Sequence, residues 1–298
     1  MTAKAQGVLH DLGYQPYRGE RLPQARRFRV IAKNVIAIAW RQKWGVRLPV
    51  LLTGLVTIIG CVLIYVIRYA ASFFGAHGPD DPMMMADRVV LSVSTSLGIL
   101  AFILGIRVGC TAITDDLRVG AYQFYFSRTI RPSDYLLGKL VGIALVLGIP
   151  LFGAPVVLAL FRVLLSDTLR EAWRSLHMLP ATIVFGLAGT AAYALPSAGA
   201  GALMQKRLAA QALYAGFYFV GAFVLAMFAE GLDAPGVLAL HPSADIIVIG
   251  EELLGRHKDS GAPPLWACVA ALLGYALLSV WLLHRRVARA ETTGLGGG

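Results

Sequence analysis

The sequence predicts an all-α membrane protein with six transmembrane helices, and three observations lead to that prediction. Of the 298 residues, 57% are hydrophobic and 15% are charged, whereas a soluble domain carries about 25% charged residues. The mean hydropathy is +0.66. Several apolar stretches reach the length, about 20 residues, that a helix needs to cross the hydrocarbon core of a bilayer.

Residues 1–47 precede the first apolar stretch, and we expect a cytosolic lead followed by an amphipathic helix at the membrane interface. A basic amphipathic helix that carries Trp is typical of that interface, and a soluble helix packed on a partner remains the alternative. Because the basic start lacks a cleavable apolar core, we expect the first span to act as the insertion signal. Within 24–44, the apolar residues at nearly helical spacing are Phe28, Ile31, Val35, Ile38 and Trp40.

The transmembrane domain is expected over residues 48–283, followed by a cytosolic tail, 284–298, with a Gly-rich end. Pro49 is tolerated in the opening turn of the first span, and Pro196 is expected to kink the fourth. The six expected spans are 48–69, 89–113, 136–160, 179–204, 210–228 and 265–283.

The basic residues predict that both ends of the chain lie in the cytosol. In that orientation, 20 of the 27 Lys and Arg residues fall on the inner side, which is the asymmetry that orients membrane proteins. The net charge of +10 is thereby explained without nucleic acid, which we do not expect as a partner.

The longest outer segment is 230–264, and we expect one helix within it. Ser243 is placed to cap that helix, and Ile246, Ile249 and Leu253 would share its apolar face. We expect this helix to lie on the outer leaflet or to dip into it.

Ionisable residues are almost absent from the middle of the expected spans, which argues against a proton-coupled carrier. Arg68, Arg107, Arg162 and Glu230 fall near span ends, where long side chains can reach the interface. None of the six His residues falls within a span, so we expect no haem or metal site. The sequence has no Gly-x-Ser-x-Gly and no His-Glu-x-x-His motif, so we expect no catalytic residue.

Small residues recur four apart in the expected spans, at Gly105 and Gly109 and again at Gly138 and Gly142. Such pairs let helices approach closely in lipid, and they predict a tightly packed bundle and a subunit interface. Ser197 has no nearby base in sequence, so we expect its hydroxyl to bond a helix carbonyl.

The inner loop over 111–139 has the most informative sequence of the chain. It is polar and aromatic, it is compatible with a helix up to Pro132, and a span holds it at each end. Gly138-Lys139 is followed by Leu140, so the Walker phosphate-binding pattern fails and this chain is not expected to hydrolyse ATP. The loop contains, in order, Asp115-Asp116, Gly120-Ala121, Tyr122 to Phe126, Ser127-Arg128, Ile130-Arg131, Tyr135 and Gly138-Lys139.

This pattern resembles the permease subunits of type-2 ATP-binding-cassette (ABC) transporters, which are mainly prokaryotic exporters. In that family an acid ends the second span, and Gly-Ala or a similar pair and aromatics follow. Ser-Arg or Thr-Arg, Ile or Val, Arg, an aromatic and Gly-Lys come next. The motif covers about thirty residues, and the six-span layout extends the resemblance to most of the chain. The resemblance implies a permease that exports a substrate across the bacterial cytoplasmic membrane.

The resemblance also implies partners. Two six-span subunits would pair, as a homodimer or with a relative, and each would dock one cytosolic ATPase that binds ATP and Mg. The loop from Asp115 to Asp134 would be the coupling helix seated in a groove of the ATPase. The candidate coupling residues are Asp115, Asp116, Gly120, Tyr122, Phe124, Tyr125, Arg128, Arg131, Asp134 and Tyr135.

Seven of these candidates have an expected physical role. Asp115 and Asp116 would pair with basic groups of the ATPase. Arg128 and Arg131 would pair with its acids or with lipid phosphates. The three central aromatics would supply buried anchors, and Lys139 would extend to lipid headgroups. Substrate-binding residues cannot be read from the sequence. A secondary carrier or channel, a polytopic membrane enzyme and a structural subunit remain the alternative functions.

Overall fold

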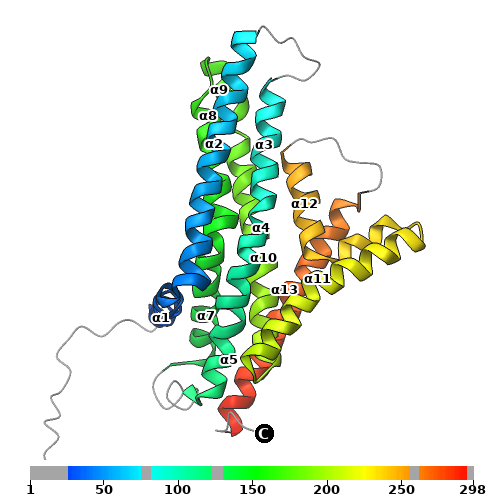
Figure 1. The fold of residues 1–298 in the computed structure, drawn as a ribbon. Helices are drawn as coiled ribbons and strands as arrows, with labels where there is room; N and C mark the ends of the chain where they lie inside the picture. The colour runs from blue at the N-terminus through cyan, green and yellow to red at the C-terminus, as the bar shows by residue number, and fades with distance from the viewer. Residues whose placement is uncertain (1–25, 75–81, 122–129, 255–261, 294–298) are drawn as a thin grey trace, which may run out of the picture.

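A computed structural model describes residues 26–74, 82–121, 130–254 and 262–293. Over these residues the chain is helical almost throughout and contains no strand, as predicted (Figure 1). Six segments are long and apolar enough to cross a membrane, which confirms the predicted number in the described part of the chain. They are 43–69, 85–118, 132–164, 169–203, 207–231 and 265–289.

The helices of the first half, in chain order, are α1 (Arg27–Arg41), η2 (Lys43–Arg47), α2 (Leu48–Phe74), α3 (Pro82–Ser96), α4 (Gly98–Leu104), η3 (Gly105–Gly109), α5 (Cys110–Arg118) and α7 (Pro132–Gly148). Those of the second half are η4 (Ile149–Gly153), α8 (Ala154–Leu164), α9 (Leu169–Ser175), α10 (Met178–Leu203), α11 (Arg207–Gly231), η5 (Pro235–Leu240), α12 (Pro242–Leu253) and α13 (Leu265–Thr293). The tail expected from residue 284 therefore continues as helix to Thr293.

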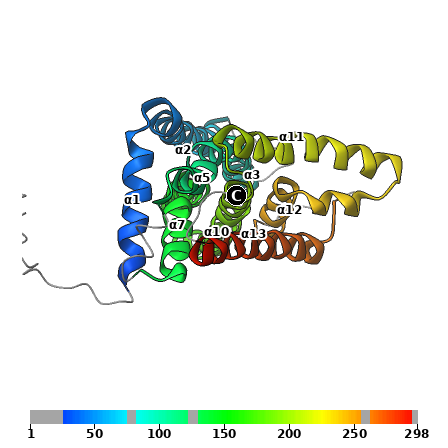
Figure 2. The same ribbon diagram turned by 90° about the horizontal axis from the view of Figure 1, so that it is seen from below.

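The central helix of the bundle is α10, which packs against α5, α7, α8, α11, α12 and α13. Its buried positions are mainly Ala, Gly, Ser and Thr, and such small side chains allow close helix approach. In Figure 1, α2, α3 and α7 run alongside it, while α11, α12 and α13 lean away towards one end. Figure 2 shows α12 between α11 and α13.

The predicted amphipathic helix is α1, and it packs along α7. Ile31 and Val35 are buried there, whereas Ile38 and Trp40 of the same predicted apolar set are exposed. The close approach depends on Gly138, since a Cβ at this position would lie 2.7 Å from the Phe28 carbonyl oxygen. The small residues therefore serve helix contacts within the chain.

Two of the predicted continuous spans contain a five-residue π-helical turn, η3 in the second and η4 in the third. Both turns pack against α10. Pro150 in η4 has no N–H to donate, which gives a local reason for that irregular turn. The sequence pattern did not predict either one.

The helix predicted in the outer segment is α12, and its Ile246 and Ile249 are buried. The predicted cap was wrong, because α12 begins at Pro242 and His241 is the residue before it. Ser243 lies within the first turn, and its hydroxyl bonds the His241 Nδ1 at 2.6 Å. This helix packs against α10 and α13.

Candidate functional site

The predicted coupling loop is described at its two ends, up to residue 121 and again from residue 130. Tyr122, Phe124, Tyr125 and Arg128 lie outside the described residues, so their roles stay predictions. On the near side, Gly120 has φ of +65°, a left-handed conformation that glycine adopts without steric cost. It comes after Val119, the C-cap of α5 (Cys110–Arg118), so Gly120 ends that helix and turns the chain into the loop.

A buried ion pair joins the two ends of the loop. Lys139 Nζ on α7 lies 2.7 Å from Asp116 Oδ2 on α5, and the same oxygen accepts a 2.8 Å hydrogen bond from the Tyr135 hydroxyl. Lys139 also donates to the Ala112 carbonyl at 2.7 Å and lies 5.6 Å from the centre of the Tyr135 ring. The ammonium therefore has a carboxylate, a carbonyl and an aromatic face as partners.

The position of Lys139 corrects the expectation that it extends to lipid headgroups. Its side chain is 3% exposed and that of Asp116 is 15% exposed. The positions of the two residues along their helices explain why Lys139 is buried. Asp116 lies in the last turn of α5, and Lys139 follows the first turns of α7. The two helices pack together, and their charges meet inside the bundle.

The neighbouring acid, Asp115, makes a second link across the same end of the bundle. It forms an ion pair with Arg207, the first residue of α11, and the second contact, from Arg207 Nε to Asp115 Oδ1, is 3.2 Å long. Both acids that were expected to face a partner thus bind basic residues of this chain. A role for them in binding an ATPase stays a prediction.

The far side of the loop returns as α7, whose start is set by local hydrogen bonding. The backbone N–H of Arg131 donates to Asp134 Oδ2 at 3.4 Å, and Pro132 occupies the first helical position, where a missing N–H has no effect on the helix. The Arg131 side chain is exposed. Asp134 therefore fixes the helix start, and Arg131 remains accessible to a partner.

A basic cavity of about 810 Å³ lies beside this region, between the end of α5 and the start of α11. Its polar lining comes from Arg118, Gln205, Lys206 and Arg207. Three cations around one open cavity attract anionic groups from solvent or from a partner surface.

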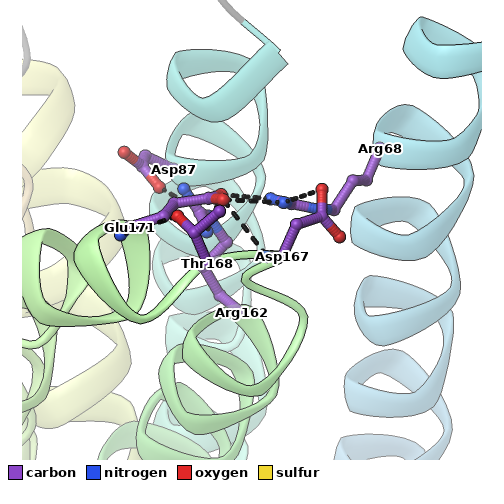
Figure 3. Close-up of polar contacts among 6 residues, drawn as sticks. All are labelled: Arg68, Asp87, Arg162, Asp167, Thr168 and Glu171. Carbon is purple, nitrogen blue, oxygen red and sulfur yellow. Dashed lines mark hydrogen bonds and ion pairs between the residues drawn. The ribbon is translucent and has the colours of Figure 1, made fainter.

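The opposite end of the bundle holds a network of five charged side chains, drawn in Figure 3. Arg68 near the end of α2 lies 2.7 Å from Asp167 and 2.5 Å from Glu171. Arg162 near the end of α8 lies 3.1 Å from Asp87 on α3 and 4.0 Å from Glu171. The network thus joins α2, α3, α8 and α9.

Arg162 differs from the expectation that it reaches the interface, because its side chain is only 2% exposed. The signal available in the sequence was the group of acids on the expected outer side. Asp87 lies just before the expected second span, while Asp167 and Glu171 follow the third. Glu171 lies in the first turn of α9, and its backbone N–H donates to the hydroxyl of the capping residue Thr168 at 3.2 Å. This hydrogen bond fixes the position of Glu171.

A shallow apolar groove of about 180 Å³ lies among α10, α11 and α13. Tyr214, Phe217 and Tyr275 line it, and the hydroxyl of Tyr214 is already bonded to the Tyr193 carbonyl at 3.2 Å. Ser197 behaves as predicted, since its hydroxyl donates to the Ala194 carbonyl at 2.8 Å. The groove suits apolar contacts rather than acid–base chemistry.

The comparisons with known proteins add no identification. No protein-family model matches this chain, and no curated protein matches it significantly. Within the described residues, no group of three or more His, Cys, Asp and Glu side chains is placed to hold a metal ion.

Proposed function

We propose that this chain is the membrane-spanning permease subunit of an ABC transporter, similar to the type-2 exporters. The observation that carries the proposal is the loop between the second and third membrane-compatible segments. Its sequence has the family pattern, and its two ends are tied to each other through Asp116 and Lys139 and to α11 through Asp115. A displacement of this loop would therefore be transmitted to α5, α7 and α11 together.

The proposed orientation puts α1, the loop ends and the start of α11 in the cytosol. Arg118, Lys206 and Arg207 gather around the cavity at that end, and an excess of basic residues favours the cytosolic side. We further propose that α1 lies in the membrane interface. Its exposed Ile38 and Trp40 support this, because apolar and aromatic side chains beside basic ones suit the headgroup region.

The proposal also defines partners. Two copies of a cytosolic ATPase would bind ATP and Mg and supply the energy, and a second permease copy would complete the transporter in the bacterial cytoplasmic membrane. The groove lined by Tyr214, Phe217 and Tyr275 supports an apolar or amphiphilic substrate. Export is proposed from the family resemblance.

Purification of the tagged chain in nanodiscs tests the proposal, with the genes beside it expressed together. We expect a soluble ATPase to copurify in a one-to-one ratio, identified by mass spectrometry, and ATP hydrolysis to depend on its assembly with the chain. Recovery of the chain alone under these conditions would reject the permease function and reopen the carrier and enzyme alternatives.

A matched pair of substitutions tests the loop as the docking site. Arg131→Glu reverses an exposed charge beside the loop, whereas Arg170→Glu reverses an exposed charge on α9 at the opposite end. Loss of an arginine anchor at an interface costs about 2 kcal/mol or more. We therefore expect Arg131→Glu to weaken ATPase binding at least about tenfold, and Arg170→Glu to leave it unchanged. Equal effects of the two variants would contradict docking at this loop.

A further inference from the structure

Asp245 lies on the buried face of α12 and is an unusual acid. The residue is 0% exposed, and neither carboxylate oxygen has a hydrogen-bond partner in the described part of the chain. No Lys or Arg side chain described in the structure lies within 4.0 Å of it. The Cys268 thiol is a nearby but weak donor. A buried ionised carboxylate with so little compensation is strongly unfavourable, so this position favours the neutral acid.

The surroundings of Asp245 offer little compensation. Ala239, Val248 and Cys268 form a small apolar cluster of η5, α12 and α13 around this part of the helix. Tyr275 on α13 is close enough to interact electrostatically with Asp245, but its hydroxyl donates to the Leu240 carbonyl. The phenol is therefore occupied by a backbone group.

The remaining titratable groups on the elements around α12 do not supply a counter-charge. Tyr193 is on α10, and Asp87 and Arg88 are on α3, with Asp87 paired to Arg162. Before α12, His241 Nε2 bonds the Tyr218 carbonyl at 3.1 Å, which requires an N–H at this nitrogen.

The Nδ1 of His241 then accepts a hydrogen bond from the Ser243 hydroxyl, so both nitrogens of the neutral ring have partners. Burial lowers the pKa of His241. This histidine therefore stays neutral around pH 7.

The same environment places the titration of Asp245 near neutrality. Burial raises the pKa of the Asp245 carboxyl to about 7, and the nearby Cys268 thiol opposes that shift. Asp245 also lies in the first turn of α12, where the helix dipole favours the ionised form. Full burial leaves no exposed site for a hydrated ion, so the species that fits this carboxyl is a proton.

We propose that Asp245 is a proton-binding site that holds η5 and α12 between α10 and α13. The carboxyl is protonated while the segment is packed. When the proton leaves, the carboxylate requires water, and the segment separates from α10 and α13 to supply it. This site does not depend on the proposed transport function, because the argument uses only the packing of α12.

The sign of the effect follows from proton linkage. The packed state has the raised pKa and binds the proton more tightly than the opened state, so opening becomes easier as pH rises. With a packed-state pKa of about 7, the opening equilibrium increases about tenfold between pH 6 and pH 8. His241 acts in the opposite direction, because protonation of its neutral ring would loosen the segment at low pH.

Hydrogen–deuterium exchange of the full chain in nanodiscs tests the proposal, at pH 6 and pH 8 and corrected for the intrinsic rate. Peptides covering 242–253 should exchange about tenfold faster at pH 8 in the unmodified chain, while peptides of α7 should not change. The matched variant Asp245→Asn removes the titration with little change in size, and its α12 peptides should be insensitive to pH.

An infrared measurement keeps the test independent of how the variant packs. A protonated carboxyl band should disappear from the unmodified chain with a midpoint near pH 7 and should be absent from Asp245→Asn. No loss of this band, or equal pH dependence of exchange in both proteins, would overturn the proposal. Restoration of protection at pH 8 by sodium but not by choline would also overturn it, in favour of a metal-cation site.

Discussion

The two ends of the bundle each contain a buried cation, but they neutralise it to different degrees. Lys139 has a carboxylate at 2.7 Å, a carbonyl at 2.7 Å and an aromatic ring beside it. Arg162 has one carboxylate at 3.1 Å and a second at 4.0 Å, and its NH1 lacks a hydrogen-bond partner in the described part of the chain. Close partners therefore surround the cation at the first end, whereas Arg162 at the second end has the capacity to donate a further hydrogen bond.

The largest effect is expected from Asp116→Asn, because it leaves the ammonium of Lys139 buried without its counter-charge. Loss of one partner of a buried pair costs about 3–5 kcal/mol. We expect a correspondingly lower unfolding midpoint in detergent and poor recovery of folded chain. The double variant Asp116→Asn with Lys139→Met should recover most of the loss, and a double variant as unstable as the single one would contradict this account.

A smaller effect is expected from Gly138→Ala, which tests how much the packing of α1 on α7 contributes to stability at the first end. The new Cβ would lie 2.6 Å from the Ile31 Cβ and 2.7 Å from the Phe28 carbonyl oxygen, so α1 must shift. Overpacking of this kind costs about 1–3 kcal/mol, measured as a lower unfolding midpoint and faster proteolysis at α1. Gly274→Ala on α13 is the control, since nothing lies within 4 Å of its new Cβ, and it should not destabilise.

The smallest effect is expected at Asp167, one of two acids of the Arg68 network. Glu171 is 17% exposed and accepts from both terminal nitrogens of the guanidinium, Nη1 and Nη2, whereas Asp167 is 82% exposed. Glu171→Gln should lower stability by about 1.5–3 kcal/mol, the range for a hydrogen bond to a charged group. Asp167→Asn should change it by about 0.5 kcal/mol or less. Unfolding midpoints in the same detergent rank the pair, and the reverse order would contradict the network geometry.

Much of the fold was predictable because apolar length is a strong local signal. The predicted span 210–228 lies within α11 (Arg207–Gly231), and the predicted span 265–283 begins at the first residue of α13. The amphipathic helix before the first span was also predicted. The side of that helix that packs on α7 was not, because Ile31 and Ile38 are equally apolar in sequence.

The candidate site was less predictable because it depends on which helices become neighbours. Lys139 and Arg162 both fall near span ends, so sequence alone favours side chains that extend to the interface. Their acids, Asp116 and Asp87, come from a different span. In sequence, Asp245 resembles any acid of an outer loop. The one sign that it would be buried was its position beside Ile246 on the apolar face of a short helix.

The π-helical turn η3 has a consequence for the length of its span. Its i→i+5 hydrogen bonds enclose one residue more than the i→i+4 bonds of an α-helical turn. The second span is therefore one residue longer than its height requires. We expect that removal of one residue from η3 restores an α-helical turn and leaves Asp116 facing Lys139. A one-residue deletion in the middle of this segment would then preserve the ion pair at its end.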